Sequence, residues 1–129
     1  MKKHEFLVDL QTATALKALG FKENCNFYFS EFDKKMDIYC SGRYANHNKY
    51  KAAFSAPTLM QTQMWIYKKS GLWIEVNAYP NENEFNYSIN SFGTICPKVG
   101  SKSFKKPEKC LLAAINDALD LIVENEILK

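Results

Sequence analysis

Apolar and polar residues alternate with a period of two in two stretches of the N-terminal half, 25–30 and 36–41. The polar segment 31–35 separates these stretches. Strands that bury one face show this period, and a polar turn between two of them is typical of an antiparallel hairpin. The pattern therefore predicts a hairpin whose apolar side chains share one face of a sheet.

The turn of this hairpin has two possible positions. A two-residue loop at Phe32-Asp33 places Cys25 opposite Cys40, where a disulfide could form. A loop at Asp33-Lys34 keeps the same apolar face and offsets the two cysteines. Free thiols are the preferred interpretation, because we expect the chain in a reducing cytosol.

A second group of strands is predicted in the C-terminal half. In residues 72–77 the aliphatic residues Leu72, Ile74 and Val76 alternate with other side chains, which predicts a strand. Residues 80–83 have the composition of a turn, and residues 85–92 are expected to form the antiparallel partner strand. A further short or edge strand is expected around 102–104.

Three helices are expected around these strands. The first extends from about residue 4 to residue 19, with Gly20 as its natural end. The second begins at Pro57, in the first helical position, continues from Thr58 to Lys69 and ends at Gly71. The third begins at Pro107 and has an apolar stripe along one side.

The predicted order is α-ββ-α-ββ(β)-α. Helices interleaved with antiparallel hairpins favour an α+β fold, which we expect to be a single two-layer domain over residues 1–129 with one antiparallel sheet and the helices packed on one face. Within it we distinguish an N-terminal helix and hairpin (1–41), a polar loop (42–54) and a helix-strands-helix segment (55–129).

The composition supports a folded chain without an obvious charged partner. Of the 129 residues 47% are hydrophobic and 14% aromatic, as in globular domains. Seventeen basic and 14 acidic residues give a net charge of only +3, and Arg43 is the one arginine. We expect a cytoplasmic protein, because the N-terminus does not have the pattern of a signal peptide and no apolar run could cross a bilayer.

Catalytic and metal-binding patterns are missing from the sequence. The four cysteines are too far apart for short zinc-ligand spacing, and the two histidines, His4 and His47, lie in no nucleophile motif. The glycines are isolated, so no phosphate-binding loop is present. We therefore expect no cofactor, no metal and no enzymatic activity, and we expect reduced, largely buried thiols.

Residues 42–54 combine aromatic and cationic side chains. These are Arg43, Tyr44, His47, Lys49, Tyr50 and Lys51. Such side chains suit stacking and phosphate contacts, and long loops in small domains are often functional. The alternative is a solvated connection whose tyrosines cover the edge of the core.

Aromatic residues on the outer faces of the strands are the candidates for partner binding. If the aliphatic residues of 72–77 face the core, Trp73 faces outward, together with Tyr87 or Phe85 of the next strand. The full candidate set is Trp73, Tyr87, Tyr28, Tyr39, Arg43 and Tyr44. Large rigid aromatics suit a protein interface, although a helix or a second copy of the chain in a homodimer could also cover them.

The C-terminal half also permits a nucleic-acid interpretation. Its order of helix, strands and helix is that of a double-stranded-RNA-binding domain, and lysines cluster before and at the start of the last helix. These lysines are Lys98, Lys102, Lys105, Lys106 and Lys109. Acidic residues of the same helix dilute the cluster, and the alternative is a solvated lysine-rich loop.

Two sequence blocks resemble a family of small uncharacterised proteins encoded by phages and prophages of Bacteroidota. One is S-A-P-T-L at 55–59, followed by Gln63 and Trp65-Ile66, and the other is G-L-W-I-E-V at 71–76. Many members carry Arg-Glu where this chain has Tyr67-Lys68, so an ion pair there is not implied. The resemblance implies a small cytosolic protein of a mobile element and supplies no catalytic residues.

These observations together predict a non-enzymatic phage or prophage accessory protein that binds a host or phage macromolecule. A host or phage protein is the first expectation for the partner, and inhibition of a host defence or regulatory system is the candidate role. The alternative is an RNA- or DNA-binding module that uses the cluster from Lys98 to Lys109. No membrane partner is expected.

Overall fold

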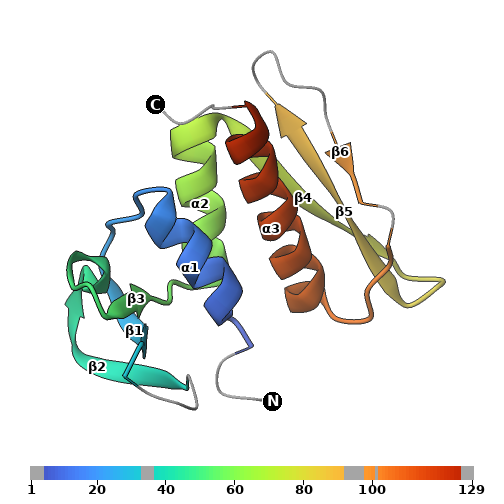
Figure 1. The fold of residues 1–129 in the computed structure, drawn as a ribbon. Coiled ribbons are helices and arrows are strands. Elements are labelled where there is room, and N and C mark those ends of the chain that lie inside the picture. Colours follow the sequence, from blue (N-terminus) through green and yellow to red (C-terminus); the bar gives the residue numbers. More distant parts are fainter. Residues whose placement is uncertain (1–4, 33–36, 92–97, 101, 126–129) are drawn as a thin grey trace. The chain divides into compact units, whose positions relative to one another are not determined.

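The computed structural model of the chain describes residues 5–32, 37–91, 98–100 and 102–125 (Figure 1). The chain divides into two compact units, Met1–Thr58 and Leu59–Lys129, here called unit 1 and unit 2. The α+β class is confirmed, with three α-helices packed on antiparallel strands in the described part. The expectation of one sheet is wrong, because each unit has a three-stranded sheet of its own.

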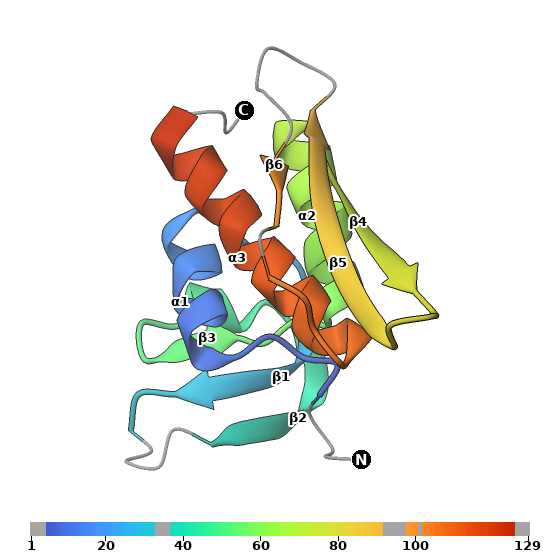
Figure 2. The ribbon, with the colours of Figure 1, turned by 90° about the vertical axis from the view of Figure 1, so that its right-hand side faces the viewer.

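Unit 1 contains one α-helix, one 3-10 helix and three strands. They are α1 (Leu10–Ala18), β1 (Cys25–Ser30), β2 (Ile38–Ala45), η1 (His47–Lys49) and β3 (Ala53–Ser55). The strand order is β2-β1-β3, with both pairs antiparallel, and Figure 2 shows β1 between its two neighbours.

The register between β1 and β2 is the one predicted for a loop at Asp33-Lys34. Phe29 lies opposite Ile38 and Phe27 opposite Cys40, while an irregularity between Cys25 and Phe27 brings Cys25 opposite Ala45. Both cysteines are free thiols. Cys40 is exposed, which corrects the expectation that all the thiols are largely buried. Residues 33–36 of the turn and Cys96 lie outside the described residues.

Residues 42–54 do not form one long loop as expected. Strand β2 continues through Ala45, η1 comes next, and β3 pairs with β1 so that Phe54 lies opposite Phe29. The pattern does not reveal the third strand, because three residues are too few to show a period of two. This pairing brings the predicted loop residues onto the sheet.

Helix α1 begins at Leu10, later than predicted. Leu7 forms a β-bridge with Thr58, and the backbone N–H of Val8 donates to the carbonyl of Pro57 at 3.0 Å, so these residues are extended. The carboxylate of Asp9 then caps the helix by accepting a hydrogen bond from the Thr12 N–H at 2.9 Å.

The end of α1 agrees with the prediction. Gly20 has a φ of +91°, the left-handed conformation that glycine adopts without strain. The N–H of Phe21 donates to the carbonyl of Leu16 at 2.9 Å, as in a Schellman motif, and the Phe21 ring is buried. The chain therefore turns back on the helix at the predicted position.

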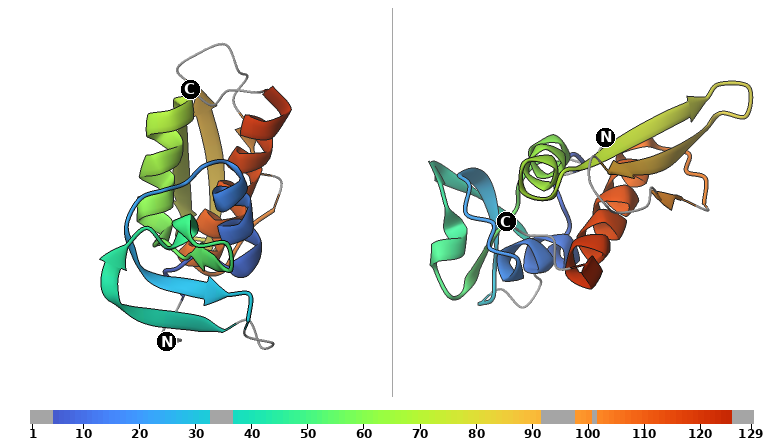
Figure 3. Two further views of the ribbon diagram at one scale, coloured as in Figure 1. Left: turned by 60° about the vertical axis from the view of Figure 1, so that its left-hand side comes forward. Right: turned by 90° about the horizontal axis from the view of Figure 1, so that it is seen from above.

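Unit 2 has the order helix, three strands, helix. Its elements are α2 (Leu59–Ser70), β4 (Leu72–Tyr79), β5 (Glu84–Ser91), β6 (Lys98–Val99) and α3 (Pro107–Asn125), with strand order β4-β5-β6. Helix α2 begins at Leu59 and not at Pro57 as predicted, because the carbonyl of Pro57 and Thr58 pair with the extended residues 7–8. The edge strand is at 98–99 instead of 102–104, where Phe104 forms only an isolated bridge with Phe85. Figure 3 shows β4 and β5 as a long twisted ribbon.

The core of unit 2 lies between this ribbon and its helices. Ile74 and Ile89 are opposite each other in the register and are both buried. The buried residues of α3, among them Ile115, Leu119 and Ile122, follow a helical period. Because α2 and α3 contact each other and both contact β4, one apolar layer serves all these elements (Figure 1).

Candidate functional site

The candidate aromatic residues of unit 2 do not form an open surface. Tyr87 lies opposite Val76 and is only 5% exposed, which corrects its prediction as an outward residue. Its hydroxyl donates to the carboxylate of Asp117 on α3. Trp73 is half-buried, and its ring meets the ring of Tyr67 edge-on, with the centroids 5.4 Å apart. Of these two candidate residues in unit 2, only Trp73 is partly accessible to a partner.

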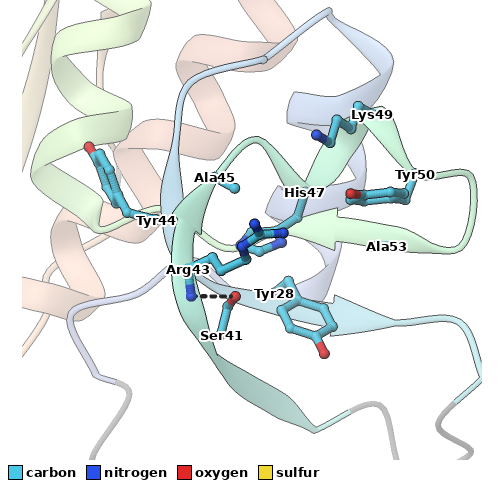
Figure 4. Close-up of a pocket in the computed structure, with 9 residues that line it drawn as sticks. All are labelled: Tyr28, Ser41, Arg43, Tyr44, Ala45, His47, Lys49, Tyr50 and Ala53. Carbon is cyan, nitrogen blue, oxygen red and sulfur yellow. Dashed lines mark hydrogen bonds between the residues drawn. The ribbon is translucent and has the colours of Figure 1, made fainter.

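In unit 1 the structure brings several predicted residues together around one pocket (Figure 4). The pocket has a volume of about 630 Å³. It is lined by Tyr28, Ser41, Arg43, Tyr44, Ala45, His47, Lys49, Tyr50 and Ala53. We call this the tyrosine pocket. Its walls come from all three strands and from η1, so residues far apart in sequence meet there.

Stacked rings form one wall of the tyrosine pocket. The ring of Tyr28 stacks on that of His47, with centroids 4.9 Å apart and an interplanar angle of 26°. It also stacks on Tyr39, its partner across the hairpin, at 5.8 Å and 29°. Tyr39 is 42% exposed and so extends the aromatic surface beyond the pocket. Two of the predicted outer-face tyrosines thus lie on the same face of the β1–β2 pair.

His47 is held firmly in this wall. It is 7% exposed, and its Nε2 lies 2.9 Å from the carbonyl oxygen of Cys25. Because a carbonyl oxygen only accepts, Nε2 donates in this hydrogen bond. The backbone N–H of His47 donates to Ser55 Oγ at 3.1 Å, and the Ser55 N–H donates to the side chain of Asn48 at 2.8 Å. These bonds tie η1 to β1 and β3.

Lys17 fixes the turn between η1 and β3. Its Nζ donates to the carbonyl oxygens of Tyr50 at 2.7 Å, Lys51 at 3.1 Å and Ala53 at 2.6 Å. The charged amine stabilises three carbonyl groups that lie close together in one turn. Sequence reasoning misses this positioning residue, because no local signal links a helix lysine to a turn more than 30 residues away.

Four side chains of the pocket lining are exposed: Arg43, Tyr44, Lys49 and Tyr50. Tyr50 is 54% exposed, and Lys49 Nζ lies 5.1 Å from its ring centroid. Arg43 is exposed, and its backbone N–H donates to Ser41 Oγ at 3.0 Å. Figure 4 shows the Arg43 side chain extending toward His47, whereas the Tyr44 ring points away from the other side chains. Tyr44 is therefore at the rim.

The charge around the pocket is positive. Its lining includes Arg43 and Lys49 and no acidic residue. Unit 1 has nine basic and six acidic residues, whereas unit 2 has eight of each, so the net charge of +3 resides in unit 1. The field at the pocket therefore favours anionic ligands.

The thiol of Cys25, whose carbonyl oxygen accepts from His47, is not set up as a nucleophile. Cys25 is buried, and this burial raises the pKa of its thiol to about 12, although a hydrogen bond with Ser55 opposes the shift. The thiol is therefore protonated at neutral pH, and a thiolate would be needed for attack. Among the described residues, no three His, Cys, Asp or Glu side chains lie close enough together to hold a metal ion.

The lysine cluster of unit 2 is exposed but partly neutralised. Lys102, Lys105, Lys106 and Lys109 lie between β6 and the first turn of α3, and all are exposed. Lys105 Nζ lies 3.4 Å from Glu84 Oε1, and Glu108 lies in the first turn of α3. Lys98 is in β6, where the structure does not describe its side chain.

Comparisons with family models, curated proteins and solved structures give no match for this chain. In the part of the chain that the structure describes, no helix combines the length and the apolar character needed to cross a membrane.

Proposed function

We propose that this chain is a non-enzymatic binding protein and that the tyrosine pocket of unit 1 holds an anionic group of a host or phage macromolecule. The observation that carries the proposal is the composition of the pocket: exposed tyrosine and arginine side chains stand on a wall of stacked rings, without an acidic residue. Tyrosine and arginine are among the residues enriched in the hot spots of binding surfaces.

The firmness of the pocket supports the same proposal. Hydrogen bonds donated by His47 and Lys17 and one accepted by Asn48 hold the segment between β2 and β3 in place, so little conformational entropy is lost when a ligand binds. With the resemblance to phage proteins, the proposed role is that of an accessory protein. Blocking a host defence or regulatory system is the consequence we propose for binding.

Affinity capture from a lysate of a Bacteroidota host tests this function. The tagged chain is compared with Arg43→Ala and Tyr50→Ala, two variants at exposed positions that leave the packed wall intact. Captured proteins and nucleic acids are both identified. We expect one partner class that the wild type retains and both variants lose.

Exposed residues of unit 2 provide matched controls. Tyr79 is 46% exposed and Lys68 is exposed, and neither lines the pocket. Tyr79→Ala and Lys68→Ala should retain the partner. Equal capture by wild type and the pocket variants contradicts the proposal, and so does a partner that is lost only on Trp73→Ala.

A second candidate function is RNA or DNA binding by unit 2. The order α2-β4-β5-β6-α3 is that of double-stranded-RNA-binding domains, and four exposed lysines precede and begin α3. Such domains contact a duplex of about 16 base pairs through its phosphates. The even charge balance of this unit and the contact between Lys105 and Glu84 make it the weaker candidate.

Fluorescence anisotropy with labelled RNA duplexes of about 20 base pairs tests the second candidate. A variant with Lys105, Lys106 and Lys109 changed to alanine should bind more weakly and with a shallower salt dependence, because each lost phosphate contact reduces the slope by about one. Absence of duplex binding at about 50 mM salt, or equal binding by the triple variant, rules this candidate out.

A further inference from the structure

Among the exposed rings that line the tyrosine pocket, Tyr44 points away from the other lining side chains, which leaves the ring of Tyr50 as the stacking surface inside the pocket. The ring of Tyr28 has close neighbours, His47 and Tyr39. Tyr50, in contrast, is 54% exposed and has Lys49 near its ring. In the view of Figure 4, Lys49 lies on one side of the Tyr50 ring, while Tyr28 and Arg43 lie on the other. A planar group could therefore stack on Tyr50 inside the pocket.

Two cations line the same pocket: Lys49, which lies near the Tyr50 ring, and Arg43, which extends toward His47. The guanidinium of Arg43 presents a planar fork of donors that matches the oxygens of a phosphate, and the Lys49 amine adds a point charge. No acidic side chain of the lining competes for them. The pocket thus combines a stacking surface with a phosphate-binding pair of cations.

The rest of the lining narrows the class of ligand. The only aliphatic residues in it are Ala45 and Ala53, so an aliphatic ligand would find little apolar surface. An acidic peptide would use the cations but leave the Tyr50 ring without a partner. A volume of about 630 Å³ has the size of a small-molecule site. A flat aromatic group that carries a phosphate uses both the Tyr50 ring and the two cations of the lining.

We propose that the tyrosine pocket binds a nucleotide unit, with the base stacked on Tyr50 and the phosphate held by Arg43 and Lys49. The ligand is either a free nucleotide or one nucleotide within a single strand, because both present a base and a phosphate. The stacked wall and the hydrogen bonds of η1 preform the site, and nothing in it reads the edge of a base by a fixed pattern of donors. Binding therefore tolerates different bases.

Direct titration of the purified chain tests the ligand class. Isothermal titration uses adenosine monophosphate, adenosine and inorganic phosphate at about 50 mM salt, and anisotropy uses labelled single strands of RNA and DNA about eight residues long. Adenosine monophosphate should bind more tightly than adenosine or phosphate. Binding of the strand more than about tenfold tighter than of the free nucleotide identifies a single strand as the source, and comparable binding identifies a free nucleotide.

Variants at the two proposed contacts give the expected magnitudes. Tyr50→Ala should weaken binding by about fivefold to a hundredfold, the range for losing one stacked base, whereas Tyr50→Phe should retain it. Arg43→Ala should halve the salt dependence of strand binding, from a slope of about −1.4 for two phosphate contacts to about −0.7. Circular dichroism verifies that each variant is folded.

The control variants are Tyr79→Ala and Lys106→Ala in unit 2, which should bind the nucleotide and the strand like the wild type. The inference is overturned if neither ligand binds at about 50 mM salt, or if Arg43→Ala and Tyr50→Ala bind both unchanged. The inference rests on the proposed function, but the two can fail independently. If capture from lysate depends on Arg43 and Tyr50 while no nucleotide binds, the pocket still binds a partner and only the nucleotide inference is wrong.

Discussion

Gly100 lies so close to the ring of Tyr87 that a side chain does not fit there. A Cβ atom at this position would be 2.5 Å from Cε2 of that ring, a separation that real Cβ atoms do not show. The ring has no free space to retreat, because Tyr87 is buried and its hydroxyl donates to Asp117. A glycine just after the short edge strand thus permits a tyrosine in the core.

We predict that Gly100→Ala destabilises the chain by about 1–3 kcal/mol, the usual cost of overpacking a core. Urea denaturation followed by circular dichroism measures the change. Gly42→Ala is the matched control, because nothing lies within 4 Å of a Cβ at that glycine. It should stay within about 0.5 kcal/mol of the wild type. A Gly100→Ala variant as stable as this control would show that the ring can move.

The described cysteines differ sharply in accessibility. Cys40 is exposed on β2, whereas Cys25 and Cys110 are buried. Burial raises the pKa of the Cys110 thiol to about 11, so it is protonated at neutral pH. Only a thiolate that a reagent can reach reacts quickly.

Labelling with an aromatic disulfide reagent at about pH 8 should therefore show a fast phase that includes Cys40. In Cys40→Ser the fast phase should lose the amplitude of one thiol, while Cys110→Ser should leave it unchanged. Counting the thiols released in each phase by absorbance makes the comparison independent of the other cysteines. An unchanged fast phase in Cys40→Ser contradicts the described exposure.

At the scale of elements, the end of one helix sets where the next element begins. Gly71 has a φ of +77° and its N–H donates to the carbonyl of Tyr67 at 2.9 Å, so α2 stops and β4 begins at the next residue. Boundaries with local signals are predicted well from the sequence: the end of α2, the turn at 80–83 and the start of α3 at Pro107 all agree. Beginnings set by distant partners cannot be read from local patterns.

The beginning of α1, which follows the pairing of Leu7 and Val8 with residues 57–58, gives a third prediction. The carboxylate of Asp9 caps the helix, and it also accepts a hydrogen bond from Thr12 Oγ1 at 2.6 Å. Asp9→Ala should destabilise the chain by about 1 kcal/mol, because two hydrogen bonds are lost at the first turn. Asp9→Asn keeps an acceptor and should lose less than half as much. Urea denaturation separates the two, and equal losses would mean that charge alone matters.

The residue types of the candidate site can be predicted from the sequence, but their arrangement cannot, because it depends on pairing between distant segments. The aromatic and cationic side chains of 42–54 are recognisable by type, and the alternation places Tyr28 and Tyr39 on one face. Their meeting around one pocket depends on the β1–β3 pairing and on Lys17, neither of which has a local signal. The outward prediction for Tyr87 neglects the register of its strand, since Ile89 has the same parity and is buried.

For the whole molecule, both units hide titratable groups from water. Cys25 is buried in unit 1, and Cys110 and Tyr87 are buried in unit 2. Burial raises the pKa of each of these groups, and for Tyr87 the hydrogen bond to Asp117 adds to the increase. All three groups are neutral when protonated, so they affect stability in the same direction as the pH rises.

We predict that the free energy of unfolding falls above about pH 9. Below that pH the thiols are protonated in both the folded and the unfolded chain, so they do not change the free energy of unfolding with pH. Between about pH 9 and about 11 for Cys110, or about 12 for Cys25, only the unfolded chain releases the proton, so stability decreases by at most about 1.4 kcal/mol per pH unit for each thiol. Urea denaturation from about pH 8 to about pH 11 under reducing conditions measures this slope.

The double variant Cys25→Ala, Cys110→Ala should have a flatter slope, whereas Cys40→Ala, at an exposed thiol, should keep the wild-type slope. If the double variant lost stability as steeply as the wild type, the buried thiols would not be the source of the alkaline sensitivity.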